Sequence, residues 1–143
     1  MPRHSETRHL PYTPEQIFDL VADVGAYPNF LPWCIGARVY DRRTDGFFAD
    51  LIIGFKVFKE RFTSKVTLER PDHVHVDYIK GPLRYLHNDW RFEPATDGGT
   101  NIHFTVDFEF KNKLFENLAG ALFTEAVNRM VGAFERRAFA IYG

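Results

Sequence analysis

The sequence has almost no net charge, a single cysteine and no long apolar run. Its 18 Lys and Arg residues nearly balance 19 Asp and Glu residues. No excess of positive charge draws the chain onto nucleic acid, so we expect no DNA partner. The lone Cys34 excludes an internal disulfide and a cysteine-rich zinc site. Because no stretch of about 18 consecutive apolar residues occurs, a transmembrane helix is also excluded.

Targeting signals and common catalytic motifs are missing as well. The segment Met1 to Leu10 has no apolar core of a secretory signal, and Glu6 and Glu15 interrupt any acid-poor transit peptide. We therefore expect a cytoplasmic protein. The motifs of metalloproteases, phosphate-binding loops, dinucleotide-binding folds and serine hydrolases are absent. The sequence thus predicts no catalytic residue and no enzyme activity.

A metal site is not expected either. His73 and His75 are two residues apart on a predicted strand and project to the same face. No third ligand is marked by the sequence, and Val74 and Val76 occupy the opposite, inward positions, so we interpret the histidines as surface residues. Cys34 has no neighbouring base, which favours a buried, unreactive thiol.

The aromatic content is high. Aromatic residues make up 16% of the chain, and its 15 Phe residues outnumber the leucines. A chain of 143 residues is the size of one domain, here residues 1–143, and can bury a sizeable core without disulfides. The excess of Phe therefore needs an explanation beyond core formation alone.

Two segments are predicted to be helices. Thr13, Pro14 and Gln16 form the signature of a capping box ahead of an apolar stripe that begins at Ile17. Residues 113–142 contain no proline, carry an apolar face at helical spacing and predict one helix about 45 Å long. The proline-containing segment 27–33 between helix and strands is interpreted as an apolar loop with at most one helical turn.

The middle of the chain alternates between apolar and polar residues, as strands with one buried face do. The predicted strands cover residues 4–10, 35–42, 46–55, 58–69, 74–78, 86–92 and 102–110. Tight turns separate several of them, which indicates an antiparallel sheet of six or seven strands. One long helix must cover the apolar face of that sheet, so the fold class is α+β. A curved sheet around one helix would leave a lined space between them.

A few polar residues fall on the inward side of this pattern. Glu60 and Asn88 share the parity of apolar neighbours, and Tyr78 adds a phenol. A carboxylate inside the sheet would be a polar anchor for a ligand in an apolar pocket, whereas one at the sheet rim would have no such role. Both positions stay open for Glu60. The loop with Phe30, Leu31 and Trp33 would plug the core, gate a pocket or contact a membrane surface.

Several motifs resemble the coenzyme Q-binding family of START-like proteins. The likeness begins with FDLVADV at residues 18–24 and YPNFLPWC at residues 27–34. It continues in chain order through residues 62–66, 81–83, 88–92 and 134–138. One departure is Leu83, where the family pattern has Phe after Gly-Pro. The likeness covers nearly the whole chain.

The resemblance implies a helix-grip fold, START-like and similar to the birch-pollen allergen, with a curved antiparallel sheet around a long C-terminal helix. Members of the family hold ubiquinone or its precursors and support quinone biosynthesis and respiratory electron transport, without a covalently bound cofactor, catalytic triad or metal. Two related groups share the fold. They are the polyketide cyclases and dehydratases, and a toxin subgroup that blocks ribosomal subunit association. The motifs do not separate the toxin subgroup from the quinone binders.

Our leading hypothesis is a non-catalytic carrier or chaperone for ubiquinone or a related isoprenoid quinone, placed in the cytoplasm and at the inner face of the respiratory membrane through transient contact. The alternatives are a toxin-like protein that binds the large ribosomal subunit and a cyclase-like enzyme. The candidate polar anchors are Glu60 and Asn88. The expected hydrophobic lining consists of Phe30, Leu31, Trp33, Phe62, Tyr78, Leu83, Trp90, Phe104, Phe108, Leu118, Leu122 and Met130.

Overall fold

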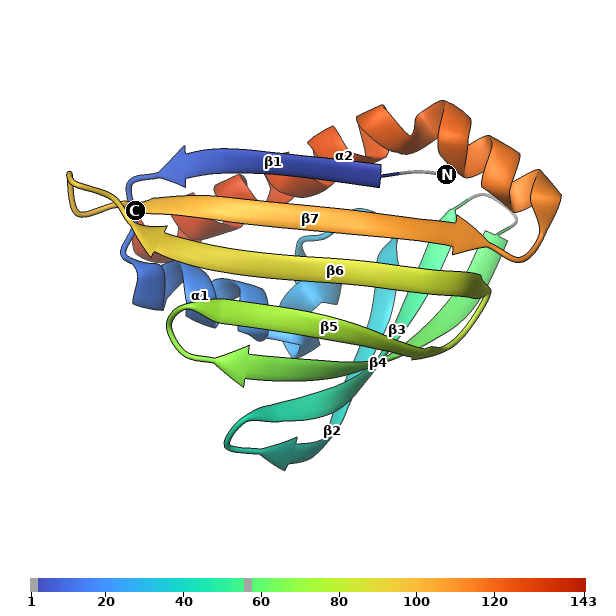
Figure 1. The fold of residues 1–143 in the computed structure, drawn as a ribbon, viewed down its shortest axis with the longest axis horizontal. Coiled ribbons are helices and arrows are strands. Elements are labelled where there is room, and N and C mark those ends of the chain that lie inside the picture. The colour runs from blue at the N-terminus through green and yellow to red at the C-terminus, as the bar shows by residue number, and fades with distance from the viewer. Residues whose placement is uncertain (1–2, 56–57) are drawn as a thin grey trace.

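A seven-stranded antiparallel sheet and a long C-terminal helix make up most of the computed structural model, which describes residues 3–55 and 58–143 (Figure 1). The strands are β1 (Arg3–Leu10), β2 (Cys34–Arg43), β3 (Gly46–Phe55), β4 (Phe58–Glu69), β5 (His73–Lys80), β6 (Leu83–Pro94) and β7 (Thr100–Phe110). The helices are α1 (Pro14–Ala22), the 3-10 helix η1 (Val24–Asn29) and α2 (Lys113–Tyr142). The predicted α+β helix-grip fold is confirmed.

The sheet has the strand order β1-β7-β6-β5-β4-β3-β2, so its first strand pairs with its last. Register shifts interrupt β2, the β4–β5 pairing and the start of β6, and such irregularities bend a sheet and increase its twist. Figure 1 shows β2 and β3 running steeply across the direction of β6 and β7, whereas β4 bends to run beside β5. The sheet therefore curves, and α2 lies across its concave side.

The capping box predicted for α1 is present. The Thr13 hydroxyl accepts a hydrogen bond from the Gln16 backbone N–H at 3.2 Å, and the Thr13 N–H donates to Gln16 Oε1 at 3.0 Å. Ile17 and Phe18 on the next turn are 1% and 3% exposed, so the cap fixes the start of a helix whose apolar face closes one end of the core.

Removing this cap has a predictable cost. Thr13→Ala deletes the acceptor of one orphan helical N–H and is expected to lower the free energy of unfolding by about 1 kcal/mol. Urea denaturation monitored by circular dichroism measures the change. Thr124→Ala, at an exposed position within α2, is the control and should leave stability unchanged or slightly higher, because Ala is the better helix former. Equal losses in the two variants would contradict the capping role.

The core is densest where the second half of α2 meets α1 and the centre of the sheet. Every buried residue of α2 lies at or after Val127, and Ala138 is 0% exposed. Phe134 packs against Trp90 at 5.3 Å between ring centroids and against Tyr27 at 5.6 Å. The first half of α2 is less deeply packed, which leaves space between it and the sheet.

The segment after α1 differs from its predicted form. A 3-10 helix, η1, starts at Val24 and contains Pro28, so the helical turn begins before the loop predicted at residues 27–33. The Tyr27 hydroxyl donates a hydrogen bond to the Val21 carbonyl oxygen, which ties this segment to α1. Within residues 3–55 and 58–143, no helix combines the length and apolar character needed to span a bilayer.

Candidate functional site

An inner cavity of about 350 Å³ lies between the concave face of the sheet and the second half of α2. Its walls come from strands β2 to β7, from α1, η1 and the loop that follows η1, and from α2. The wall residues include Leu31, Trp33, Cys34, Phe62, Ser64, Asn88, Trp90, Phe104, Phe108, Ala126, Met130 and Phe134. The described lining includes no charged side chain, so the cavity suits an apolar ligand.

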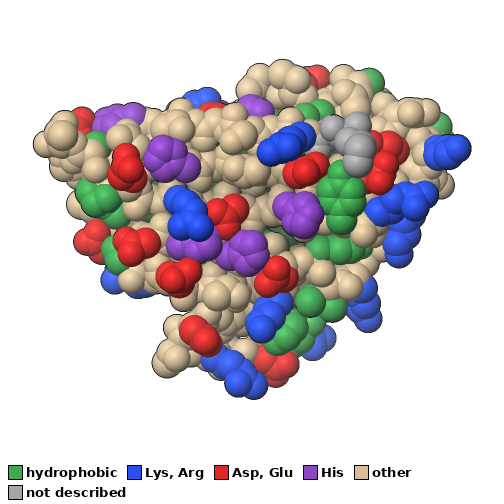
Figure 2. Space-filling model, in the orientation of Figure 1, with side chains coloured by type: hydrophobic (Ala, Val, Ile, Leu, Met, Phe, Trp, Pro, Cys, Tyr) green, Lys and Arg blue, Asp and Glu red, His purple; other side chains and the backbone are tan. Residues whose placement is uncertain are grey.

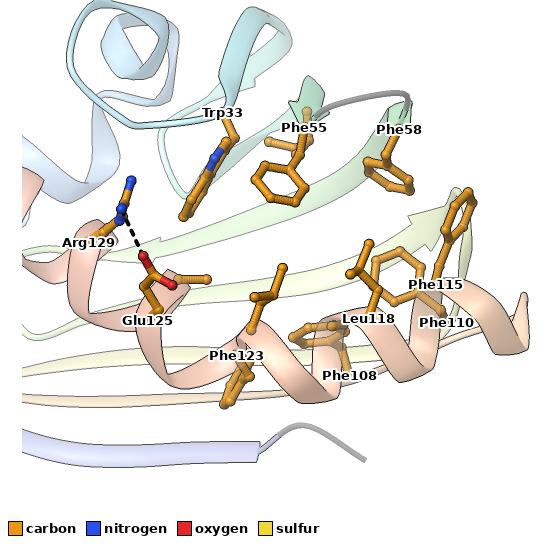
Figure 3. A pocket seen from close by; sticks show the side chains of 14 residues that line it. Trp33, Phe55, Phe58, Phe108, Phe110, Phe115, Leu118, Phe123, Glu125 and Arg129 are labelled. Atoms are coloured by element: carbon orange, nitrogen blue, oxygen red, sulfur yellow. Dashed lines mark hydrogen bonds and ion pairs between the residues drawn. The ribbon is translucent and has the colours of Figure 1, made fainter.

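A second cavity, here called the mouth, has a volume of about 270 Å³ and lies between the first half of α2, the end of β7 and the β3–β4 hairpin. Figure 3 shows aromatic rings from Phe55 and Phe58 facing Phe115 and Leu118 across this space. Phe58 and Phe115 are in edge-to-face contact, with ring centroids 4.9 Å apart. The mouth is apolar except for an ion pair at its inner edge.

The two cavities adjoin, because they share part of their apolar lining. The shared residues are Trp33, Ile53, Phe108, Phe123 and Ala126. Close to this junction the mouth is edged by Glu125 and Arg129, whose Oε1 and Nη2 atoms are 2.7 Å apart (Figure 3). A chain-like ligand could therefore reach from the inner cavity past Trp33 to the mouth.

Trp33 holds an unusual backbone conformation at this junction. Its φ angle is 67°, a left-handed value that is uncommon outside glycine. Its carbonyl oxygen accepts a hydrogen bond from the Gly54 N–H at 2.8 Å, and its ring contacts Phe55 edge-to-face at 5.9 Å. These contacts to β3 hold the indole between the two cavities.

The inner cavity wall includes the small polar side chains of Ser64, Asn88 and Cys34. The Asn88 amide donates to the Thr105 carbonyl oxygen at 3.0 Å, and its Oδ1 accepts from Trp90 Nε1 at 3.2 Å. Because an amide NH₂ has two hydrogens, Asn88 keeps one donor for a ligand. These groups could orient a polar head without the cost of burying a charge.

Burial perturbs two ionisable groups of the wall. Burial raises the pKa of the Tyr27 phenol well above its usual range, with smaller contributions from Cys34 and Asp23. It also raises the pKa of the Cys34 thiol, against a smaller opposing effect of the Gly36 backbone. Both groups therefore stay protonated and neutral at physiological pH, in keeping with an apolar cavity.

Cys34 gives a chemical probe of this burial. The thiol is 5% exposed and its pKa is raised, so little reactive thiolate is present at pH 8. We expect the native protein to react with Ellman's reagent at least roughly tenfold more slowly than the urea-unfolded chain. Absorbance at 412 nm follows the reaction of this single cysteine, and equal rates in the two states would contradict a buried cavity position.

Most of the predicted lining residues border the two cavities. The inner cavity is lined by Leu31, Trp33, Phe62, Trp90, Phe104, Phe108 and Met130, together with the predicted anchor Asn88. Leu118 and Leu122 line the mouth, as do Trp33 and Phe108. The three predicted loop residues therefore differ: Leu31 and Trp33 face the cavity, whereas Phe30 does not.

Three other predicted lining residues lie elsewhere. Phe30 packs against Phe134 at 5.3 Å and borders a separate outer groove. The Tyr78 hydroxyl accepts a hydrogen bond from the Leu83 N–H at 3.0 Å, so both residues are used to hold the β5–β6 turn. Leu83 is 2% exposed and is a core residue of that turn.

Of the two positions left open for Glu60, the structure shows the one at the sheet rim, with an exposed side chain, so Glu60 is not an internal anchor. Its backbone partner is Ile53, a lining residue, so Glu60 has the inward parity that the sequence indicated. It lies two residues from the start of β4, at the rim of the sheet. Strand parity indicates which side of the sheet a side chain faces, but it does not show which part of that side is covered by α2.

Several cavity residues were absent from the predicted set. Ser64 shares the parity of Phe62 and Val66, so the pattern did contain the signal for its inward position. Ala126 and Phe123 line both cavities, but helical spacing alone could not show which part of α2 stands over open space. Phe55 is the last residue of β3, where alternation gives no guide.

Comparison with protein families and curated proteins gives consistent matches. A family model described as polyketide cyclase / dehydrase and lipid transport matches residues 10–135. The ribosome association toxin RatA of Rickettsia prowazekii is 36% identical over 136 residues, with 92% of each chain covered. RatA of Escherichia coli is 35% identical and covers 99% of this chain and 90% of its own. The coenzyme Q-binding protein COQ10 homolog B of Xenopus laevis is 37% identical, over 98% of this chain and 59% of its own length.

Solved structures share the same fold. An 18 kDa protein from Caulobacter crescentus superposes with a TM-score of 0.81 at 36% identity, over 100% of this chain and 99% of its own. A Streptomyces aromatase/cyclase superposes with a TM-score of 0.82 at 14% identity, over 96% and 93% of the two chains. The second likeness concerns the fold alone.

Proposed function

The chain belongs to the polyketide cyclase/dehydrase and lipid transport family, and from this premise we propose that it binds an apolar, chain-like ligand without transforming it. The observation that carries the proposal is the pair of adjoining apolar cavities, the inner cavity and the mouth. Its walls are apolar, and each Å² of ligand surface removed from water contributes about 25 cal/mol before the costs of binding. The described inner lining offers no charged acid or base for catalysis.

An isoprenoid quinone such as ubiquinone fits this arrangement. Its ring carbonyls accept hydrogen bonds, which the free Asn88 N–H and the Ser64 hydroxyl would supply inside the cavity. Its tail needs only an apolar channel, which leads past Trp33 into the mouth. The name of the frog relative supports this ligand class. A quinone would thus bind head inward, with the tail toward the mouth.

The experiment is extraction of the purified protein with organic solvent, followed by mass spectrometry. A protein produced in a quinone-making host is expected to carry quinone. The stripped protein should then bind added ubiquinone with quenching of tryptophan fluorescence, because both tryptophans line the inner cavity. Asn88→Leu should weaken quinone binding more than binding of a plain isoprenoid alcohol. A protein that carries no quinone and shows no quenching would overturn this ligand.

The rim of the mouth supports transient contact with a membrane that holds such a ligand. Leu114 is 71% exposed and Leu118 41% exposed, and the exposed Lys111 and Lys113 precede them. Figure 2 shows Lys and Arg side chains gathered at the end of the molecule where β7 leads into α2. Basic residues near an anionic bilayer contribute about 1 kcal/mol each, so this end would face the lipid surface.

Vesicle sedimentation tests the orientation. The protein should sediment with phosphatidylglycerol-containing vesicles more than with pure phosphatidylcholine vesicles. The double variant Lys111→Glu and Lys113→Glu should lose this preference, whereas Lys65→Glu, an exposed position within β4, should retain it. Equal binding by the two variants would show that the rim of the mouth does not contact the membrane.

Ribosome association is the second candidate function, and the names of most curated relatives favour it over quinone binding. One feature of this chain suits contact with ribosomal RNA. A groove of about 510 Å³ lies between the loop Pro28–Pro32 and the α2 residues Arg129 and Arg136. Arg136 is exposed, and guanidinium groups bind phosphate oxygens well. The groove shares only Leu31 and Pro32 with the inner cavity, and its two arginines lie outside the inner lining, so the two functions are compatible.

Co-sedimentation with purified large ribosomal subunits tests the second candidate. We expect the wild-type protein to sediment with the subunit at low salt, and Arg136→Gln to weaken this binding. Arg43→Gln, at an exposed position on β2, is the control. Absence of co-sedimentation, together with normal growth on overexpression, would reject the ribosome as partner while leaving ligand binding intact.

A further inference from the structure

A cluster of histidine and acidic side chains lies on the outer face of β5 and β6, opposite the cavity. His73 and His75 project from β5 to this face, and Asp89 on β6 pairs directly with His75. Val74, between the two histidines, is buried and lines the inner cavity from the other side. Figure 2 shows His and acidic side chains gathered over the middle of this face.

One carboxylate oxygen joins the two imidazoles. Asp89 Oδ1 lies 2.5 Å from His73 Nε2 and 2.9 Å from His75 Nδ1. The three atoms lie within 4.8 Å of one another, and all three residues are half-buried. The sequence marked only the two histidines, because strand pairing supplies the third group from sixteen residues downstream of His73.

The remaining nitrogen of each imidazole also faces a carboxylate. His73 Nδ1 is 2.9 Å from Glu69 Oε1, and His75 Nε2 is 3.0 Å from Asp77 Oδ1. A neutral imidazole has one N–H, so a histidine that donates to its outer carboxylate presents a lone pair toward Asp89. Two imidazole lone pairs would then face the Asp89 carboxylate, and a positive charge between them is needed to offset their repulsion. Histidines that bind metals typically have such an outer carboxylate partner, which fixes the tautomer and ring orientation.

The charges of the cluster are unbalanced when both histidines are neutral. Glu69, Asp77 and Asp89 are acidic. Arg91 Nε lies 3.4 Å from Asp89 Oδ2, and Lys65 is the cross-strand partner of Asp77. The carboxylates therefore outnumber these two cations, and the cluster favours added positive charge, either as protons or as a metal cation.

We propose that His73, His75 and Asp89 form a zinc-binding site with further coordination positions open to water. Two imidazole nitrogens and one carboxylate oxygen are a ligand set typical of Zn²⁺ and disfavour Mg²⁺ or Ca²⁺, which prefer oxygen. Tetrahedral zinc with bonds of about 2.0–2.1 Å separates its ligand atoms by about 3.3 Å. Asp89 Oδ1 now lies 2.5 and 2.9 Å from the two histidine nitrogens, so small side-chain rotations would bring the three atoms to the spacing that zinc needs.

The strand pairing prepares this site. His75 and Asp89 are direct cross-strand partners, and His73 is diagonal to Asp89 across the same pair of strands. The backbones of both strands are held by the sheet, so binding requires side-chain adjustment and little ordering of the chain. The site is independent of the ligand proposed for the cavity, although Val74 and Asn88 place it on the reverse of the cavity wall.

Isothermal titration of ZnCl₂ into protein stripped of metal with EDTA and then dialysed tests the proposal at neutral pH. The wild-type protein is expected to bind one equivalent with a dissociation constant in the micromolar range or tighter. Asp89→Asn and His75→Gln should abolish measurable binding. Asp77→Asn, which touches only the outer side of His75, should weaken binding roughly tenfold to a hundredfold. His103→Gln is the matched control, because this β7 histidine bonds to Thr7 and should leave zinc binding unchanged.

Two further results decide between a metal site and a network of protonated histidines. Arg91→Gln should tighten zinc binding, since it removes a competing cation next to Asp89. Zinc should also shift the imidazole nitrogen NMR signals of His73 and His75 but not of His103. Circular dichroism confirms that each variant is folded. Absence of stoichiometric binding by the wild type, or equal binding by Asp89→Asn, would overturn the proposal.

Discussion

Ala126→Trp is expected to lose most of the affinity for any ligand that reaches from the inner cavity to the mouth. Ala126 lines both cavities at their junction, and an indole there would occupy the path beside Trp33. Excluding on the order of 100 Å² of apolar contact would forfeit about 2.5 kcal/mol, which is roughly a 70-fold loss of affinity. Tryptophan-independent measurement, such as retention of radiolabelled ubiquinone on a desalting column, gives the dissociation constant.

The control for this prediction is Ala121→Trp. Ala121 lies on the same helix but is exposed, so the same substitution adds an indole outside the path. Both variants should unfold at similar urea concentrations, since neither position is fully buried. Equal affinity of the Ala126 and Ala121 variants would show that the ligand does not pass the junction.

Phe134→Ala is expected to lower the free energy of unfolding by about 3 kcal/mol. Phe134 is 7% exposed, and its ring contacts Tyr27, Phe30 and Trp90 at centroid distances of 5.6, 5.3 and 5.3 Å. Its removal deletes buried area and the aromatic contacts that hold η1 and α2 together. For a domain whose total stability is typically 5–15 kcal/mol, such a loss is large.

Phe139→Ala separates this packing effect from a general effect of losing Phe in α2. Phe139 is 69% exposed, so its truncation should change stability by less than about 0.5 kcal/mol. Urea unfolding followed by circular dichroism compares the two variants. If both cost the same, the aromatic cluster would not be the anchor of the second half of α2.

Local signals determined most of the elements. The helix predicted at residues 113–142 matches α2, and the capping box places the start of α1 at Pro14. These predictions succeeded because helix ends depend on neighbouring residues. Strand alternation likewise identified the inward face of β7, whereas the strand ends at Leu83 and Pro94 lay beyond the alternating pattern.

The site was only partly predictable, because parity fixes a side of the sheet but not a position under the helix. Phe62 and Glu60 share a parity, yet Phe62 borders the cavity and Glu60 is exposed at the rim. Tyr78 has an inward parity too, but its hydroxyl accepts a hydrogen bond from the Leu83 N–H. The partner of His73 and His75 was hidden for a related reason, since Asp89 meets them only through strand pairing.

The pairing of β1 with β7 has a consequence for the order in which the protein folds. Arg3 lies opposite Asp107, and near the other end of the chain the Tyr142 hydroxyl donates to the Gln16 carbonyl oxygen at 2.9 Å. Contacts so distant in sequence slow folding, typically to milliseconds or seconds. During synthesis β1 must wait for the intervening strands and for β7 itself (Thr100–Phe110) before its partner exists. The cavity, whose walls include β7 and α2, can therefore close only after α2 has also been synthesised.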